Sequence, residues 1–480
     1  MKFPSHKTKI VCTIGPASRE PGVLEKLFEN GMSMARLNFS HGSTQDHLRD
    51  IKAIRAAARK TGHLCAILAD LPGPKIRIGD LAQEPFVLVK GEEVTLTTRD
   101  VPRSPGQIPV AYKALPRSVK KGSIIYLSDG FLQLTVLSVN GPEVRCRVVI
   151  GGKLYSHKGI NLPGAKIYAD TVTRHDLELV DFALKQGISI FAVSFVERGA
   201  DLRLIRQFAR KRGKEVRLVA KIERSEAMDN FYDILKEADG VMVARGDLGV
   251  QIPIEDVPVA QKWLIHETKL TGKPVITATQ MLASMTDNVR PTRAEATDVA
   301  NAIVDGTDAV MLSEETAMGK YPAETVAMMA RIASSIERRY RPFKFSRHLM
   351  EHFKGNGTVG KTSVEDQVSV NVVESMRSLG VRFILTPTES GSTARLIARF
   401  KPDSWILAFS PSESAHEFMA LSYGVKSCPG VRCGRNGWEV PVLDFVRKHG
   451  LAKAGEKLIL TEGGISGRSG STDTMRVILK

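Results

Sequence analysis

The sequence predicts an α/β protein built on a (β/α)8 TIM barrel, with a small all-β lid domain inserted into the barrel and a C-terminal α/β three-layer domain. Eight short apolar runs alternate with helical patterns, and they begin roughly 23–34 residues apart, with one gap of about 124. Eight strand–helix units are the number that closes such a barrel. The long gap and a new strand–helix series after residue 345 predict the two further domains.

The predicted barrel strands are short apolar runs of the kind found in buried strands. They lie at 8–13, 33–37, 64–69, 188–193, 217–220, 240–244, 274–278 and 308–312. Helical patterns lie between most of them, for example at 22–30, 43–62, 200–213 and 256–272. The barrel is therefore expected to occupy 1–72 and 168–344.

The inserted domain is expected at 73–167, where short β-like runs are separated by turn signals such as KG, DG, NGP and GG. These runs lie at 86–90, 93–98, 123–128, 132–139 and 143–150. An insertion that leaves a barrel after its third strand sits above the catalytic face. Joints rich in Gly and Pro at 72–74 and 159–164 would let it swing as a lid.

The C-terminal domain is expected at 345–480, with apolar runs separated by helical stretches. The runs lie at 383–388, 405–410, 425–429, 457–463 and 474–480. The polar, Gly-rich segment 351–362 is expected to be mobile.

Composition narrows the class of protein. The 480 residues exceed what one hydrophobic core usually supports, and 42% apolar with 25% charged residues is ordinary for soluble globular chains. The five cysteines lack metal-ligand spacing, which favours buried thiols in a reducing compartment over disulfides. No signal peptide and no membrane span is evident, so we expect a cytoplasmic protein without a membrane partner.

A net charge of +16 and a pI near 9.6 leave two interpretations open. A basic chain can bind nucleic acid, or it can present a basic surface that attracts anionic metabolites. Lys and Arg are spread over helical stretches such as 203–217 and 331–344, with few aromatic residues between them and no nucleic-acid motif. This distribution favours the second interpretation, without a nucleic-acid partner.

Two short charged runs follow apolar stretches near the middle of the chain, Lys221-Ile222-Glu223 and Arg245-Gly246-Asp247. A lysine and two carboxylates at the carboxyl ends of neighbouring barrel strands can hold a divalent metal and a bound anion. Lys221 and Glu223 alternate along the strand, so both side chains point to the same side. The pattern predicts an enzyme that acts on phosphate, and a structural salt bridge at the barrel mouth is the alternative.

The chain resembles the pyruvate kinase family over nearly its whole length. The residues that carry the resemblance are TKIVCTIGPAS, MARLNFSHG, ADLPGPKIR, HKGINLPG, AVSFV, VAKIE, VMVARGDLG, ITATQML and PTRAE, in the family's order. The resemblance implies Mg²⁺-dependent (or Mn²⁺-dependent) phosphoryl transfer from phosphoenolpyruvate to ADP, giving pyruvate and ATP in the final step of glycolysis. It also implies a homotetramer with an allosteric sugar-phosphate effector.

The resemblance assigns roles around the metal. Glu223 and Asp247 would hold Mg²⁺, and Lys221 would stabilise charge on the transferred phosphoryl group. Thr279 would lie beside the enolate carbon, where it or a linked water supplies a proton, unless it only caps the next helix. The expected substrate-binding positions are Arg36, Ala244, Arg245, Gly246, Asp247 and Thr279, and the glycines around Asp247 would let free backbone N–H groups approach the substrate carboxylate.

The resemblance also implies a nucleotide side and a monovalent-cation site. Asn38, His41, Arg77 and Lys158 match nucleotide-side positions, although His41 could equally be a structural loop residue. The cation-site positions are Asn38, Ser40, Asp70 and Leu71. Potassium-dependent members carry threonine and glutamate where this chain has Leu71 and Lys75. Because an ammonium group can replace K⁺ electrostatically, we expect an enzyme that does not require K⁺.

One loop of the C-terminal domain is a candidate effector site, formed by Thr388, Glu389, Ser390, Gly391, Ser392 and Thr393. Hydroxyl groups, a glycine and a helix N-terminus can cradle a phosphate, and the family places sugar-phosphate effectors here. A plain helix cap is the alternative, because Glu389 would repel an anion.

Two other functions stay open at this point. A barrel enzyme acting on an oxoacid, such as a metal-dependent aldolase or a phosphoenolpyruvate mutase, would use the carboxylate pair but neither Arg77 nor Lys158. A non-catalytic nucleic-acid-binding protein would have no use for the Lys221, Glu223 and Asp247 set.

Overall fold

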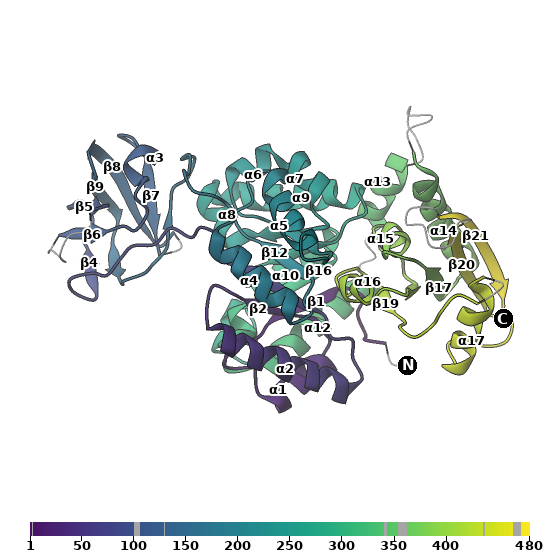
Figure 1. Cartoon of the computed structure of the whole chain (residues 1–480). Helices are drawn as coiled ribbons and strands as arrows, with labels where there is room; N and C mark the ends of the chain where they lie inside the picture. Colours follow the sequence, from purple (N-terminus) through teal and green to yellow (C-terminus); the bar gives the residue numbers. More distant parts are fainter. Residues whose placement is uncertain are drawn as a thin grey trace.

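Three units lie in a row, with a closed barrel between a β-rich unit and an α/β unit (Figure 1). The computed structural model describes residues 1, 3–99, 106–128, 130–339, 343–353, 362–434, 437–463 and 472–480. Most of the polar segment 351–362 lies outside the described residues.

The barrel contains the eight strands that the sequence predicts, all paired in parallel with their neighbours. They are β1 (Lys9–Thr13), β2 (Met32–Asn38), β3 (Ile67–Leu71), β12 (Ile190–Val193), β13 (Arg217–Ile222), β14 (Gly240–Ala244), β15 (Val275–Ala278) and β16 (Ala309–Leu312). The TIM-barrel prediction is confirmed.

Some of the helices around the barrel start at side-chain caps that the sequence supplies. Ser43 and Asp46 form a capping box at the start of one helix, and Thr173 with Asp176 does the same for another. The helices are α1 (Pro21–Glu29), α2 (Thr44–Thr61), α4 (Arg174–Lys185), α5 (Gly199–Arg210), α6 (Ser225–Asp229), α7 (Phe231–Glu237), α8 (Arg245–Gln251), α9 (Val257–Leu270), α10 (Arg293–Val304), α11 (Glu314–Ala317) and α12 (Pro322–Arg339), with 3-10 turns at Ile254–Asp256 and Ala283–Thr286.

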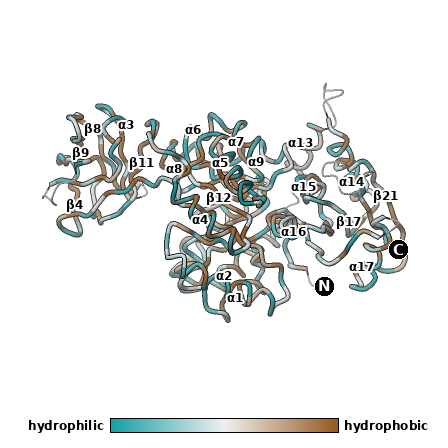
Figure 2. Tube along the Cα trace, in the orientation of Figure 1, coloured by the Kyte–Doolittle hydropathy of each residue, from teal (hydrophilic) through white to brown (hydrophobic). Residues whose placement is uncertain are grey.

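The barrel interior is packed with side chains rather than open. One cluster of fully buried side chains fills the space enclosed by the strands, and it includes Val11, Met34, Leu68, Val219 and Met242. Other strand residues, which alternate with these along each strand, pack outward against the helices. Hydrophobic residues accordingly concentrate in the barrel strands (Figure 2). Polar chemistry is therefore confined to the ends of the barrel.

The β-rich unit leaves the barrel after β3 and has a hydrophobic core of its own. Its strands are β4 (Phe86–Leu88), β5 (Glu93–Thr97), β6 (Gln107–Pro109), β7 (Ile124–Leu127), β8 (Leu132–Asn140), β9 (Glu143–Ile150), β10 (Gly152–Leu154) and β11 (Ile160–Asn161), with one short helix, α3 (Leu115–Ser118). β10 pairs with β4, and the other six strands form one sheet.

The two chain segments that join this unit to the barrel are hydrogen-bonded to each other. The N–H of Ile78 donates to the carbonyl of Lys158 at 3.0 Å, and the N–H of Ile160 donates to Ile76 at 2.9 Å. Arg77 and Gly159 form an antiparallel bridge between these bonds. The two segments therefore form one narrow antiparallel ribbon, which we call the tether ribbon.

The C-terminal unit is a five-stranded sheet with helices on it, as predicted. Its strands are β17 (Phe383–Pro387), β18 (Trp405–Phe409), β19 (Val425–Ser427), β20 (Lys457–Gly463) and β21 (Thr472–Leu479), in the order β19-β18-β17-β20-β21. All pairs are parallel except β20 with β21. Its helices are α13 (Phe343–Phe353), α14 (Val364–Leu379), α15 (Ser392–Ala398), α16 (Glu413–Met419) and α17 (Glu439–Lys448).

This unit closes the end of the barrel at which the strands begin. Phe418 and Leu421 belong to the same buried cluster as the barrel interior. Beside them, buried Asp308 pairs with Lys269 at 2.7 Å and with Lys401 of the C-terminal unit at 3.2 Å. Burial would raise the pKa of Asp308, but the two lysines lower it below its usual range. A buried ionic cluster thus joins the two units.

All five cysteines are free. Cys12, Cys146 and Cys428 are buried and Cys65 is half-buried, as expected, whereas Cys433 is exposed, contrary to the prediction of buried thiols. Among the residues that the structure describes, no helix has the length and apolar character needed to cross a membrane.

We predict that Asp308→Ala destabilises the protein by about 3–5 kcal/mol, because it leaves the ammonium groups of Lys269 and Lys401 buried without their shared carboxylate. Differential scanning calorimetry would detect this as a large drop in the midpoint of thermal unfolding. Asp287→Ala is the matched control, since it removes a carboxylate whose partner Lys320 is exposed. Equal midpoints for the two variants would refute the role of the buried cluster.

Candidate active site

Four charged side chains meet at the end of the barrel where β2, β3 and β13 finish. The guanidinium of Arg36 donates to Asp70 at 2.7 Å. The ammonium of Lys221 lies 3.1 Å from Asp70 and 2.8 Å from Glu223. Asp70 and Glu223 are almost completely buried, with exposed fractions of 1% and 2%. The spacing argument is confirmed for Lys221 and Glu223, whose side chains point to the same side of the strand.

Lys221 stays cationic in this cluster. Burial lowers its pKa, but the charges of Asp70 and Glu223 more than compensate and leave the pKa above its usual range. Its ammonium also donates to the hydroxyl of Ser194 at 2.6 Å. The lysine is therefore a fixed positive charge that is held from three sides.

Glu223 is the least satisfied member of the cluster. Burial raises its pKa to about 7, and nearby Asp247 adds to the rise, while Lys221 and the N–H of Phe195 oppose it. The N–H of Phe195 donates to one oxygen of Glu223 at 2.7 Å, and Lys221 pairs with the other. A carboxylate whose charge is disfavoured by burial and by a second carboxylate gains stability from a cation that both can share.

Glu223 and Asp247 fit a divalent metal by this chemistry. Hard carboxylate oxygens are the ligands that Mg²⁺ takes in phosphate-handling sites, where one or two carboxylates act together with substrate oxygens. Within the described parts of the chain, no three or more His, Cys, Asp and Glu side chains gather in a way that could hold a metal.

Backbone strain is concentrated at the same end of the barrel. Phe195, Thr279 and Gln280, which follow β12 and β15, have φ values of 57°, 71° and 52°. Such left-handed conformations cost about 1–3 kcal/mol each in residues other than glycine, and they persist where the surroundings impose them. At Phe195 the strained backbone aims its N–H at Glu223. The strain helps to position the site.

Thr279 is tied to the turn that carries Asp247. Its hydroxyl donates to the carbonyl of Ala278 at 2.6 Å and accepts from the N–H of Gly246 at 2.8 Å. The sequence predicts that the glycines around Asp247 leave backbone N–H groups free for a bound anion, and here the N–H of Gly246 is hydrogen-bonded to Thr279. A Cβ at Gly246 would lie 3.3 Å from the Thr279 hydroxyl, a tight contact that favours glycine.

Arg245 points away from the charged cluster. Its guanidinium donates to the carbonyl of Thr279 at 2.7 Å and to Asp298 at 2.7 Å. The side chain therefore supports the Thr279 turn, whereas the sequence predicts that it binds substrate. Ala244 is the last residue of β14 and is buried, so it can contribute only backbone to a ligand.

Two expected nucleotide-side residues lie on the tether ribbon. Arg77 donates to the carbonyl of His157 at 2.9 Å, and the neighbouring Lys158 accepts through its carbonyl from Ile78. Burial lowers the pKa of the His41 imidazole, and the charges of Arg77, Lys75 and Arg36 lower it further, so these cationic side chains lie close to His41. The structure therefore brings His41, Lys75 and Arg77 into one cationic neighbourhood at the barrel mouth.

The expected cation-site residues lie at the carboxyl ends of β2 and β3, with Ser40 just past β2. The side-chain oxygen of Asn38 accepts from the N–H of Ser40 at 3.2 Å. Asp70 is paired with Arg36 and Lys221, so its carboxylate is already compensated. The carbonyl of buried Leu71 accepts from the Ser194 hydroxyl at 2.7 Å.

The candidate effector loop uses several of its polar groups internally. The hydroxyl of Thr388 accepts from the N–H of Gly391 at 3.0 Å, and the hydroxyls of Thr393 and Thr472 are 2.5 Å apart. The carbonyl of Ser390 accepts from Arg395 at 2.8 Å, and the carbonyl of Glu389 accepts from Ser410 at 3.0 Å. The helix that follows, α15, has seven residues.

The sequence does not predict the role of Ser194. Its hydroxyl accepts from Lys221 and donates to Leu71, so it bridges β3 and β13 across β12. The contact of Thr13 with the charged cluster is not predicted either: its hydroxyl accepts a hydrogen bond from Arg36 at 2.8 Å. Both residues lie at or just past the carboxyl end of a barrel strand, which is the signal that could have identified them.

Comparison with known proteins agrees with this geometry. The family description "Pyruvate kinase, barrel domain" matches residues 5–326, and "Pyruvate kinase, alpha/beta domain" matches 366–478. A pyruvate kinase of Thermococcus litoralis is 46% identical over 478 residues, covering 99% of each chain. One of Staphylococcus epidermidis is 42% identical over 98% of this chain and 80% of its own. A crystal structure of a Cryptosporidium parvum pyruvate kinase superimposes with a TM-score of 0.91 at 35% identity, covering 99% of this chain and 96% of its own.

We predict that Glu223→Gln weakens binding of Mn²⁺ by roughly tenfold or more, because it removes one of two carboxylate ligands. Titration followed by electron paramagnetic resonance measures free Mn²⁺ directly and needs no turnover. Glu178→Gln, an exposed glutamate of α4, is the control and should bind Mn²⁺ like the wild type. Unchanged affinity in Glu223→Gln would remove this residue from the metal site.

Proposed function

This chain belongs to the pyruvate kinase family, and from that premise we propose that the charged cluster at the barrel mouth is its active site. The reaction transfers the phosphoryl group of phosphoenolpyruvate to ADP and yields pyruvate and ATP. The match across both domains excludes the aldolase, mutase and nucleic-acid-binding alternatives that the sequence left open.

The observation that carries the proposal is the fixed ammonium of Lys221, held by Asp70, Glu223 and Ser194 at the end of β13. Phosphoryl transfer passes through a loose transition state with charge spread over the equatorial oxygens. A cation held in place before the reaction stabilises that charge without reorganisation. Arg36, which shares Asp70 with Lys221, offers a second cation to the same group.

A divalent metal completes this arrangement, and the pyruvate kinase family uses one. In our proposal Glu223 and Asp247 hold Mg²⁺ or Mn²⁺, which when bound neutralises negative charge on the phosphoryl oxygens of the substrate. Support comes from Glu223, whose pKa is raised by burial and further by the charge of Asp247.

The proposed reaction breaks one phosphorus–oxygen bond and forms another. The bond between phosphorus and the enol oxygen of phosphoenolpyruvate breaks, and a new bond forms to a terminal oxygen of ADP. The enolate left behind takes one proton on its terminal carbon to become pyruvate. We assign that proton to the Thr279 hydroxyl or to a water that it orients, since Thr279 is held at the end of β15 by Ala278 and Gly246.

The nucleotide would bind between the barrel mouth and the inserted unit. Arg77 and Lys158 lie on the tether ribbon, Asn38 ends β2 and His41 follows it. ADP phosphates placed between them would meet the cations of the ribbon on one side and hydrogen-bonding side chains of the barrel on the other. Closure of the unit 73–167 over the barrel would exclude water that could otherwise accept the phosphoryl group. We also propose the domain boundaries: 73–167 for the inserted domain, 1–72 and 168–344 for the two parts of the barrel, and 345–480 for the C-terminal domain.

Independence from K⁺ is also proposed. Asp70 already has two cationic partners, Arg36 and Lys221, and Lys75 adds charge near His41. A monovalent cation bound at Asn38, Ser40, Asp70 and Leu71 would therefore add little to the compensation of negative charge at this site.

Three finer assignments complete the proposal: a homotetramer, a cytoplasmic location, and a sugar phosphate bound at the loop Thr388–Thr393. The first two rest on the family alone. The third has limited support, because the hydroxyls of Thr388 and Thr393 are engaged within the C-terminal unit.

We predict that Lys221→Met lowers kcat roughly 10²–10³-fold, because the transition-state charge loses its fixed cation. A coupled assay of pyruvate formation measures the loss, and circular dichroism verifies that the variant is folded. Lys221→Arg should recover part of the activity by restoring a cation. Lys185→Met removes a lysine paired on the exposed surface of α4 and should leave kcat unchanged. Near-normal turnover in folded Lys221→Met would refute the assignment.

We predict that the rate with saturating substrates changes less than about twofold when K⁺ is replaced by tetramethylammonium, because the site supplies its own cations. Lys75→Glu should make the enzyme dependent on K⁺. Lys90→Glu, with the same change of charge in the inserted unit, should stay independent of K⁺. Strong stimulation of the wild type by K⁺ would contradict this prediction.

A further inference from the structure

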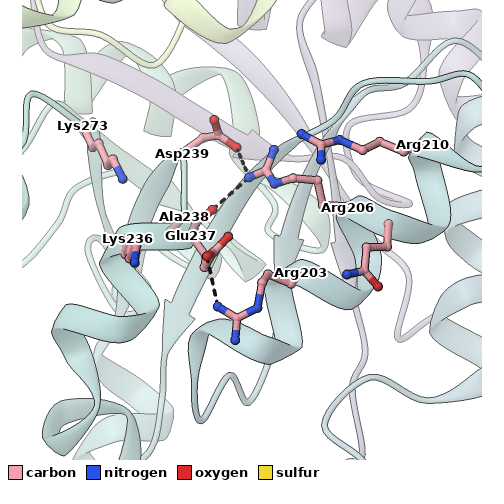
Figure 3. Close-up of a pocket in the computed structure, with 9 residues that line it drawn as sticks. Arg203, Arg206, Arg210, Lys236, Glu237, Ala238, Asp239 and Lys273 are labelled. Carbon is pink, nitrogen blue, oxygen red and sulfur yellow. Dashed lines mark hydrogen bonds and ion pairs between the residues drawn. The ribbon is translucent and has the colours of Figure 1, made fainter.

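A cavity of about 390 Å³ lies at the end of the barrel opposite the active site, between α5, α7 and the residues that precede β14 and β15. Five cationic side chains line it, namely Arg203, Arg206, Arg210, Lys236 and Lys273. Two carboxylates, Glu237 and Asp239, line it as well. Figure 3 shows the arginines reaching from α5 toward these carboxylates. Cationic groups are thus in excess in a cavity that is open to solvent.

The three arginines are aligned by helix geometry. Arg203, Arg206 and Arg210 recur at intervals of three and four residues on α5, which places them on one face of the helix. Lys236 belongs to α7, and Lys273 precedes β15. Residues from three separate parts of the barrel therefore converge on one cavity.

The carboxylates are already neutralised. Asp239 accepts from Arg206 at 2.9 Å, from Arg217 at 3.1 Å and from the N–H of Leu218 at 2.9 Å. Glu237 pairs with Arg203 at 3.0 Å. In the described parts of the chain, the side chains of Arg210 and Lys236 make no hydrogen bond or ion pair with the protein. Two cations at the cavity are therefore available for a ligand.

The cationic surroundings extend into the C-terminal unit. Burial lowers the pKa of Lys273, which Asp239 opposes, and the charges of Arg395 and Arg206 lower it further. Arg395 of α15 donates to the carbonyl of Ser390, and no residue of the loop Thr388–Thr393 lines the cavity. An anion in the cavity would relieve repulsion among these cations.

We propose that this cavity binds the phosphate group of a small organic phosphate. Arg and Lys side chains are the groups that recognise a phosphate dianion, through paired N–H donors and point charge. The volume falls in the range of small-molecule pockets and exceeds what a phosphate group alone needs, so an organic body fits beside it. A sugar phosphate and a nucleoside monophosphate share this chemistry.

The location gives such a ligand a route to the active site. Asp239 directly precedes β14 and also holds the backbone of β13 through Leu218. The same two strands are followed, at their other end, by Glu223 and Asp247, the proposed metal ligands. The cavity is thus attached to the start of both strands that carry the metal site at their other end.

Calorimetric titration of the full-length protein with ribose 5-phosphate and with AMP tests the proposal, with ribose and adenosine as unphosphorylated controls. Saturating Mg²⁺ and ADP keep the nucleotide side of the active site filled. We expect at least one phosphorylated probe to bind, and the double variant Arg210→Ala/Lys236→Ala to bind it roughly tenfold or more weakly. The probe whose affinity falls in the double variant shows whether the cavity binds a sugar phosphate or a nucleoside monophosphate.

The control double variant Lys211→Ala/Lys214→Ala removes the same charge from exposed positions outside the cavity and should bind like the wild type. The inference is overturned if neither probe binds at millimolar concentration, if both double variants lose affinity equally, or if only Ser392→Ala weakens binding, which would place the ligand at the loop Thr388–Thr393. Because binding is measured directly, none of these outcomes depends on whether the proposed catalytic roles are correct.

Discussion

The balance of charge among Arg36, Asp70, Lys221 and Glu223 is the constraint on which the chemistry of this protein depends. An isolated buried charge is costly, so each member of the cluster is stable only while its partners stay in place. The barrel meets this requirement by bringing the ends of β2, β3 and β13 together, with Ser194 bridging the gap across β12. The negative charge that stays least compensated is that of Glu223, whose pKa is raised by burial and by nearby Asp247, and this makes the corner receptive to a cation.

The opposite end of the barrel handles buried charge in another way. Asp308 is enclosed by Lys269 of the barrel and Lys401 of the C-terminal unit, and the packing of Phe418 and Leu421 closes the cluster. That cluster is complete without a ligand and serves as an attachment between units. One barrel thus carries a closed ionic cluster at one end and an incomplete one at the other, as expected where stability and reactivity occupy opposite faces.

Much of this arrangement could be predicted from sequence because it depends on local periodicity. All eight barrel strands and the same-side placement of Lys221 and Glu223 follow from apolar runs and from alternation along a strand. Contacts between distant segments could not be predicted in this way. The bridge made by Ser194 and the turn of Arg245 toward Asp298 depend on how separate strands and helices meet, and no single segment encodes that meeting.

The tether ribbon has a mechanical consequence for the inserted unit. Two independent linkers would allow a domain to tilt, twist and slide, but here the bonds from Ile78 to Lys158 and from Ile160 to Ile76 prevent one linker from sliding past the other. Ile78 and Ile160 also belong to the hydrophobic core of the inserted unit, so the ribbon is fastened to that unit rather than to the barrel. Arg77 and Lys158 lie on this ribbon, and their relative position is therefore set by the fold of the inserted unit itself.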